Sequence, residues 1–484
     1  MFSRTLLNLA LALPVIAQAA PQTADVLIRH AVVIDVEHAR AVPGQSVAIR
    51  GDAIVAVGPD AAMQAQWTAA RQVEAAGRYL IPGLWDMHVH FGGGPALVEE
   101  NKALLPLYIA HGITTVRDAS GDLPQQVLEW RGDIAAGTLF GPRLLTSGAK
   151  IEGIKPVWKG TLEVGSEADV DAAIVQLQRD RVDFVKITDS TLKPALFLYA
   201  ARAARKAGLK ASGHIPMALT VEQAVDAGLA SIEHLDYAFK AGSRDEAAIA
   251  ADFAAGRIDR AQANQRIDAS FDRPTAMAAY RDFARRGVFV TPTLNGGRIL
   301  DFLVQDDHHA DPYLAYIGPG LRATYAWRVE RAAKATPAQI AARHQHYHDV
   351  AAVLPMLQQA GVTIIAGTDA GFLNSFNFPG IGLHQEMQLF VREGLTAPQA
   401  LAAATRAGPA WFGTLDRYGA VEAGKAADLV LLDANPLQDI RATERINTVI
   451  VRGTVLDRAA LDALLQQVRG QVQQWNAEAA KAAP

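Results

Sequence analysis

Cysteine is absent from the 484 residues of this chain. Its absence excludes disulfides, thiolate zinc sites, iron–sulfur clusters and cysteine nucleophiles. Any bound metal ion must therefore be held by histidines, by carboxylates or by a group made from lysine. A chain without thiols also suits an oxidising compartment, because it contains nothing that could mispair.

An excess of charge is absent as well. The 46 basic and 50 acidic residues give a formal net charge of −4, which is too small to attract nucleic acid or an anionic membrane surface. Hydrophobic residues make up 50% and charged residues 20% of the chain, a balance typical of a globular protein with a large core. We therefore expect a small-molecule substrate and no nucleic-acid partner. The composition is compatible with a homo-oligomer as well as with a monomer.

Long hydrophobic runs are absent beyond the N-terminus. Residues 6–16 form an apolar stretch after Arg4, and Ala17-Gln18-Ala19 matches a small-residue cleavage site. This pattern predicts a signal peptide over residues 1–19 and export to the periplasm or the cell exterior. A membrane anchor is the alternative, but the run is shorter than the roughly 18 residues that a span needs. We expect no membrane span after removal of the signal.

Short strand patterns near both ends of the chain predict a small β-domain. Apolar stretches punctuated by Gly and Asp turns occupy residues 24–80 and return at 418–457, so the two ends are expected to pair into one β-sandwich. Between them, eight apolar segments alternate with Ala-rich helical stretches, which is typical of parallel βα units. The eight segments are 81–90, 114–118, 143–147, 183–187, 210–214, 231–234, 288–294 and 363–369.

This order predicts an α/β fold, a (β/α)8 TIM barrel over residues 81–417. Two gaps, 235–287 and 295–362, are too long for plain βα units, and their Ala, Leu and Tyr content favours helical insertions over the barrel mouth rather than disordered linkers. Residues 458–484 are predicted to form a solvated C-terminal helix or tail.

Two histidines, His88 and His90, end the first of the eight segments. Side chains at positions i and i+2 of a strand point to the same face, so both imidazoles can bind one metal ion. Taken alone, such a pair is as often structural as functional. Ligand-type side chains also end four other segments, namely Lys186, His214, His234 and Asp369. In a barrel these strand ends meet at one face, which predicts a shared metal site.

Lys186 lies among apolar neighbours in Phe184-Val185-Lys186-Ile187. Desolvation there should lower the pKa of its amine. A neutral amine can react with carbon dioxide to give a carbamate, whose two oxygens can bridge two metal ions. The alternative is a lysine whose charged end reaches solvent from the end of the strand.

This ordered set of residues resembles the amidohydrolase superfamily. More narrowly, it is similar to the imidazolonepropionase-related branch, which includes prolidase-like Xaa-Pro dipeptidases and ochratoxin-type amidases. The resemblance runs from about residue 24 to residue 453, and further phrases that carry it are Ile81-Pro82-Gly83-Leu84-Trp85, His111-Gly112-Ile113-Thr114-Thr115, Gly367-Thr368-Asp369-Ala370-Gly371 and Gly424-Lys425-Ala426-Ala427-Asp428.

The resemblance implies two divalent metal ions, with zinc as the default for a histidine-rich site. It places His88, His90 and Asp369 on the more buried ion, His214 and His234 on the other, and carboxylated Lys186 between them. A water or hydroxide between the metals would be the nucleophile. Lys186 and Asp369 are thus the predicted catalytic residues, and Asp369 would pass the proton to the leaving amine.

The sequence carries fewer signals for the substrate than for the metal ligands. The family's usual Arg-Asp-x-Gly-Gly reads Arg117-Asp118-Ala119-Ser120-Gly121 here, and both insertions depart from the family pattern. A substrate carboxylate would need a cation and a hydroxyl near the mouth. The predicted contacts are Tyr237, Arg117, Arg298 and His384. The alternatives are a packed aromatic for Tyr237, an ion pair of Arg117 with Asp118, and a solvated helix for Arg298.

The leading hypothesis is hydrolysis of an amide bond in a dipeptide or N-acyl amino acid. Within enzymes, the alternative is a lactonase or esterase that uses the same site. From a different class, the chain could be a non-catalytic scaffold that kept the fold, but all six ligand positions carry suitable residues.

Overall fold

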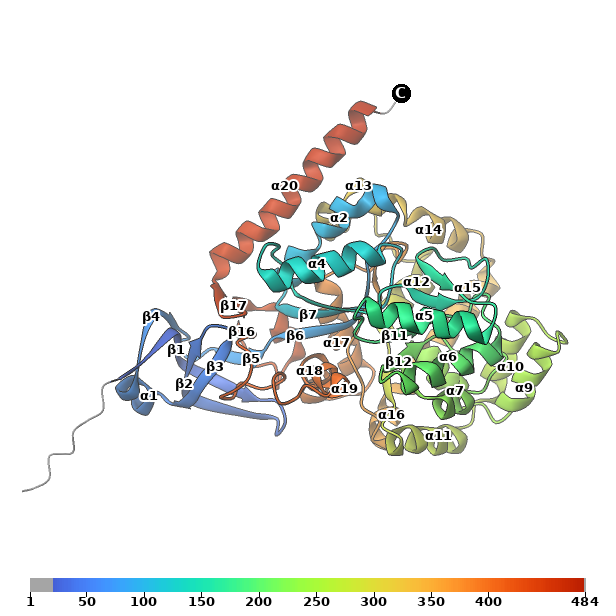
Figure 1. Ribbon diagram of the computed structural model, residues 1–484, viewed down its shortest axis with the longest axis horizontal. Helices are drawn as coiled ribbons and strands as arrows, with labels where there is room; N and C mark the ends of the chain where they lie inside the picture. Colours follow the sequence, from blue (N-terminus) through green and yellow to red (C-terminus); the bar gives the residue numbers. More distant parts are fainter. Residues whose placement is uncertain (1–20, 483–484) are drawn as a thin grey trace, which may run out of the picture.

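The computed structural model describes residues 21–482, so the predicted signal peptide lies outside the described residues. A mixed eight-stranded sheet joins the two ends of the described chain (Figure 1). Its strands are β1 (Gln22–Asp35), β2 (Arg40–Arg50), β3 (Ala53–Pro59), β4 (Trp67–Glu74), β5 (Tyr79–Pro82), β16 (Leu429–Leu432), β17 (Ile446–Val451) and β18 (Thr454–Leu456), with helix α1 (Asp60–Gln66) between β3 and β4.

Strands β5 and β16 connect the two ends of the chain. They pair antiparallel, with Ile81 opposite Val430. Ile81 and Pro82 therefore belong to this sheet, so the prediction that placed them in the first barrel strand is wrong at that boundary. Strand β1 pairs with β2, β4 and β5, so hydrogen bonds connect all eight strands into one sheet. A β-sandwich consists of two packed sheets, so the sandwich stays a prediction.

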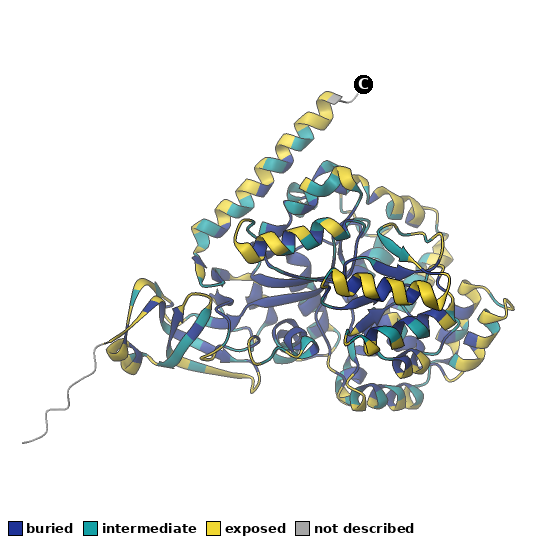
Figure 2. Cartoon of the chain, viewed as in Figure 1, coloured by how far each residue is buried: buried dark blue, intermediate teal, exposed yellow. Residues whose placement is uncertain are grey.

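Two parallel sheets form the centre of the molecule. One contains β15 (Ala370–Gly371), β6 (Leu84–His90), β7 (Ile113–Asp118) and β8 (Arg143–Thr146). The other contains β10 (Thr161–Glu163), β9 (Lys150–Glu152), β11 (Val185–Ile187), β12 (Ala211–Gly213), β13 (Leu229–Glu233) and β14 (Phe289–Thr291). Figure 2 shows most of these strands in the buried interior, whereas the residues of β10 are partly buried or exposed. The predicted α/β class with parallel strands is confirmed.

Backbone hydrogen bonds connect the two parallel sheets in two places. In the first, Asp183 N, just before β11, donates to Thr146 O at the end of β8 (2.9 Å). In the second, residues 363–366 lie between β14 and β6: Val290 N donates to Thr363 O (3.1 Å), and Met87 N donates to Ala366 O (3.0 Å). The carboxyl ends of parallel strands lie at one edge of a sheet, so the predicted ligands share a region of space.

Helices connect successive strands and cover their outer faces (Figure 1). The first six after β6 are α2 (Val98–Lys102), α3 (Leu105–Ala110), α4 (Pro124–Ala136), α5 (Glu167–Arg179), α6 (Pro194–Lys206) and α7 (Val221–Ala227). In α5 the signals are local: Ser166 and Asp169 form a capping box, and Val170, Ala173 and Leu177 are buried on one face.

Both long insertions are helical, in agreement with the prediction. The first contains α8 (Leu235–Lys240), α9 (Glu246–Ala254), α10 (Arg260–Ser270) and α11 (Arg273–Arg285). The second contains α12 (Leu294–Phe302), α13 (Pro319–Ala323), α14 (Ala326–Ala333), α15 (Pro337–Ala351) and α16 (Leu354–Ala360).

Four helices follow β15. They are α17 (Ile381–Arg392), α18 (Ala397–Thr405), α19 (Ala407–Phe412) and α20 (Arg458–Ala482), and α20 extends away from the body in Figure 1. Among residues 21–482, no helix combines the length and the apolar character needed to cross a membrane.

Candidate metal centre

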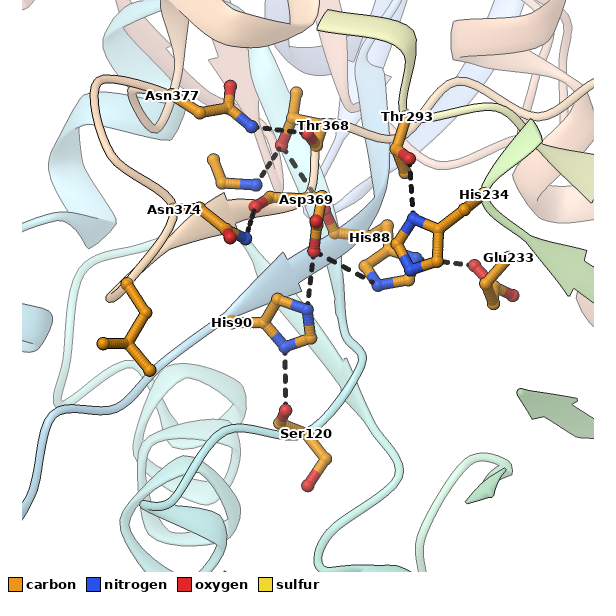
Figure 3. Close-up of polar contacts among 12 residues, drawn as sticks. His88, His90, Ser120, Glu233, His234, Thr293, Thr368, Asp369, Asn374 and Asn377 are labelled. Atoms are coloured by element: carbon orange, nitrogen blue, oxygen red, sulfur yellow. Dashed lines mark hydrogen bonds and ion pairs between the residues drawn. The ribbon is translucent and has the colours of Figure 1, made fainter. Parts of the chain in front are cut away.

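Three of the predicted ligands meet where β6 ends and β15 begins. His90 Nε2 lies 2.8 Å and His88 Nε2 lies 3.6 Å from Asp369 Oδ1 (Figure 3). One ligand atom from each of the three residues lies within 4.8 Å of the other two. This spacing is close enough for one metal ion to bind all three.

The other two predicted histidine ligands form a second pair beside the first three. His214 follows β12 and His234 follows β13, and their Nε2 atoms are 2.9 Å apart. The ring of His234 lies 5.1 Å from the ring of His88, centre to centre. The structure therefore brings all four histidines into one cluster, as two neighbouring groups.

Hydrogen bonds at Nδ1 determine whether Nε2 of each histidine has a free lone pair. Three of them use Nδ1 to donate: His88 to Glu233 Oε2 (2.6 Å), His90 to Ser120 O (2.7 Å) and His234 to Thr293 Oγ1 (2.8 Å). A neutral imidazole with its proton on Nδ1 has a lone pair on Nε2. Partners of this kind are typical of metal-binding histidines, because they fix both tautomer and ring orientation.

The contact between His90 and Asp369 has the chemistry of a cation-binding pair. Burial works against the ionised form of Asp369, but where the neighbouring histidines carry a second proton, the hydrogen bond from His90 and their charges outweigh burial and hold the pKa of that carboxyl well below its usual range. A carboxylate oxygen and an Nε2 lone pair at 2.8 Å repel each other unless a proton or a metal ion lies with them.

Left-handed backbone conformations aim two of these side chains. His234 has a φ of 73° and Asp369 a φ of 62°, which cost roughly 1–3 kcal/mol each in a residue other than glycine. Gly371 follows with a φ of 146°, where a Cβ atom would lie 2.2 Å from His90 O. Such strain concentrates at functional sites, where the surrounding structure maintains it.

Lys186 lies on β11 with its amine inside the same cluster. Its side chain is 1% exposed, and among the described residues neither its Nζ nor His88 Nε2 has a hydrogen-bond partner. Burial lowers the pKa of Lys186 to about 8, against the opposing charge of Glu233. Buried polar atoms without partners are costly. The two orphaned atoms fit a bound metal ion at His88 and a carbamate on Lys186.

Arg117 does not reach the site, so its predicted contact with substrate is wrong. Its side chain is fully buried, and Nη2 donates to both carboxylate oxygens of Glu233 at 2.8 Å. The guanidinium also lies 4.8 Å from the centre of the Trp411 ring. Arg117 thus holds Glu233, which in turn orients His88. Sequence analysis missed Glu233, although it stands directly before the predicted ligand His234.

We expect Arg117→Met to lower the free energy of unfolding by about 3–5 kcal/mol, because Glu233 would keep a buried charge without its cation. Urea unfolding measures this loss. Arg285→Met is the matched control: it breaks an exposed ion pair with Asp282, which contributes at most about 1 kcal/mol. Full stability combined with a raised KM would instead return Arg117 to the substrate.

His384 and Arg298 are also misplaced by the sequence prediction. His384 is fully buried, and its Nε2 donates to His111 O (2.9 Å). Arg298 lines a separate cavity of about 690 Å³ and pairs with Asp306 (3.3 Å). The direction of a side chain on its helix decided both cases. Tyr237 stays a candidate, because its ring stacks beside His214 with centres 6.2 Å apart.

A cavity of about 160 Å³ lies over the cluster. Its walls include the predicted ligands His90, Lys186, His214, His234 and Asp369. They also include residues that sequence analysis did not single out: Lys150, Trp158, Arg328, Phe372 and Asn374. Lys150 carries a usable signal, since it follows the third barrel segment, whereas Arg328 lies deep in an insertion without a strand pattern.

Comparison with known proteins identifies the family. A family model described as the amidohydrolase family matches residues 79–456. The chain belongs to the amidohydrolase family. This confirms the resemblance that the histidines, Lys186 and Asp369 carry in the sequence.

Individual relatives share either a short stretch of sequence or the fold. Adenine deaminase of Ruegeria pomeroyi is 41% identical over 98 residues, 20% of this chain and 16% of that protein. A bottromycin amidohydrolase superposes with a TM-score of 0.69 at 22% identity, over 92% of this chain and 90% of that one. A Xaa-Pro dipeptidase with bound methionine in its active site gives 0.63 at 21%, over 89% and 99%. The two structural likenesses show the fold.

Proposed function

We propose that this amidohydrolase is a metal-dependent hydrolase that cleaves the C–N amide bond of a small molecule, a dipeptide or an N-acyl amino acid. The observation that carries the proposal is the convergence of four histidines, an ionised carboxylate and an unpartnered buried lysine under one cavity. We further infer that the eight predicted βα segments form a (β/α)8 barrel, since backbone hydrogen bonds link the two parallel sheets in two places. The N-terminal pattern is our reason to propose export.

Two divalent ions, with zinc as the default, fit this set of side chains. His88, His90 and Asp369 would hold one, His214 and His234 the other, and carboxylated Lys186 would bridge them. When bound, the ions would supply Lewis acidity at the substrate carbonyl and lower the pKa of a water molecule.

The side chains of the chain itself would handle the proton. Asp369 is ionised and can accept the proton that water releases on attacking the carbonyl, then return it to the leaving nitrogen. The Nδ2 atom of Asn374 donates to the backbone oxygen of Asp369, which fixes the turn that carries the carboxylate. Trp158 and Phe372 line the cavity and limit the access of water to it.

Metal content and activity together test the proposal. We expect close to two divalent ions per chain by elemental analysis, because the site offers more ligands than one tetrahedral ion needs. Dipeptides and N-acyl amino acids should be hydrolysed, with loss of turnover in chelator and recovery on adding metal. Metal-free protein with full activity would contradict it.

A lactonase or esterase would use the same site, so the substrate series should include lactones and esters. Preference for these over every amide would favour that alternative. A non-catalytic scaffold would show no turnover with any of them at full metal loading.

A further inference from the structure

Two cations in the active-site cavity have no role in the mechanism above. Lys150 and Arg328 both line it, and the hydrogen bonds that they make among residues 21–482 go to backbone oxygens and to the amide oxygen of Asn374, not to a carboxylate. Lys150 is buried and Arg328 is partly buried, and a cation that is removed from water is costly unless it is paired. Asp369 is the carboxylate that acts on Arg328, but in the proposed mechanism it serves the metal ions and the proton, so both cations keep N–H groups for an anion from the substrate.

Lys150 is the first residue of β9, and its side chain lines the cavity. Its side chain is 6% exposed, and Nζ donates to two backbone oxygens, Gly121 O (3.3 Å) and Lys159 O (3.1 Å). An ammonium group has three protons to donate, so one is left for a ligand. The acidic groups that act on it from a greater distance, Asp118, Asp122 and Glu152, each accept hydrogen bonds from other parts of the chain.

Arg328 comes from α14, in the second insertion. Its Nε donates to Leu373 O (2.7 Å) and its Nη2 to Asn374 Oδ1 (3.0 Å). In the part of the chain that the structure describes, Nη1 makes no hydrogen bond. Because Asn374 contacts the backbone of Asp369, the guanidinium lies one residue away from the proposed proton carrier.

We propose that Lys150 and Arg328 form a subsite for the carboxylate of the substrate, so that the enzyme acts on amides with a free carboxylate near the scissile bond. This inference rests on the proposed amide hydrolysis. A lysine and an arginine with unused N–H groups suit a carboxylate, which accepts several charge-assisted hydrogen bonds. They take the place of Arg117 and Arg298, which the structure puts elsewhere.

The size and walls of the cavity restrict the group that carries this carboxylate. Its volume of about 160 Å³ is well below the roughly 300 Å³ or more of pockets for drug-sized ligands, so it suits one amino-acid residue. Trp158 forms an apolar wall, and its ring meets that of Trp327 edge to face, with centres 6.4 Å apart. Trp327 and Arg328 are neighbours on α14, which assigns the second insertion a role in closing the subsite.

Paired substrates test the subsite. Dipeptides and N-acetyl amino acids are assayed with metal-loaded enzyme, each as the free acid and as its C-terminal carboxamide. We expect the wild type to prefer the free acid by about 10-fold or more in kcat/KM, mainly through KM. Arg328→Gln and Lys150→Gln should each remove most of this preference, because the loss in kcat/KM should be much larger for the free acid than for the carboxamide. Arg331→Gln, an exposed position on the same helix, is the matched control and should retain the preference.

Two results would overturn the subsite while amide hydrolysis stands: no preference in the wild type, or equal losses on acid and carboxamide, as expected if Arg328 only anchors residues 373–374. If the wild type hydrolyses no amide, the proposed function fails, and calorimetry with L-phenylalanine and L-phenylalaninamide decides on the subsite. Binding of the acid that Arg328→Gln weakens about 10-fold supports it, and equal binding of both compounds to both proteins contradicts it.

Discussion

Lys186→Arg is expected to lose about 100-fold or more in kcat/KM while the protein stays folded. Arginine keeps a positive charge at this position but is always protonated and cannot form a carbamate. The wild-type amine is buried without a hydrogen-bond partner among the described residues, and Lys186 lines the cavity over the cluster. Steady-state kinetics at fixed metal concentration and elemental analysis of the same sample measure the loss.

Lys186→Ala provides the complementary experiment. A short carboxylic acid in the assay should restore part of its turnover, because the added carboxylate supplies the two oxygens that the carbamate would have supplied. Lys193→Ala is the matched control, since Lys193 is exposed at the start of α6. Near-normal turnover of Lys186→Arg would make Lys186 structural and refute the carbamate.

Asp369→Asn is expected to lower kcat by about 100-fold or more, the range that general acid–base groups typically supply. Asparagine keeps the shape and one oxygen but cannot accept a proton, so the variant should retain its fold. The loss should fall on kcat rather than KM, because the proton transfer occurs only in the transition state. Kinetics on an amide substrate measure both constants.

The leaving group separates the possible roles of Asp369. An amide nitrogen must be protonated to depart, whereas an activated ester leaves without a proton. The loss in Asp369→Asn should therefore be much smaller on a matched activated ester. Equal losses on both substrates would restrict Asp369 to holding metal or activating the nucleophile, and a loss confined to KM would remove it from the chemistry.

The residues of the cluster were predictable because their signal is local. Alternation along a strand puts His88 and His90 on one face, and a polar residue directly after an apolar segment marks a strand end, as with His214 and Asp369. Parallel strands then bring these ends to one edge of a sheet. The resemblance to amidohydrolases added the pairing of ligands, which remains a proposal.

The residues around the cluster were not predictable in the same way. Glu233 and His234 are neighbours in sequence, yet one side chain bonds to His88 in the core while the other faces the cavity. Arg117 lies near a strand end, which suggests a contact with substrate, but it pairs with Glu233 beneath the site. Arg328 lies in an insertion far from any strand end, yet it lines the cavity.

Composition, strand and helix periodicity and the residues at strand ends thus determined the α/β class, the helical insertions and the set of six candidate ligands. Only the tertiary structure decided which cations face the cavity, which histidine nitrogens carry the lone pairs and which carboxylate orients His88. The physical reason is distance along the chain. Periodicity reports which face of an element is buried, whereas the occupant of a cavity wall depends on packing between segments more than 100 residues apart, such as His88 with Glu233, whose separation is 145 residues.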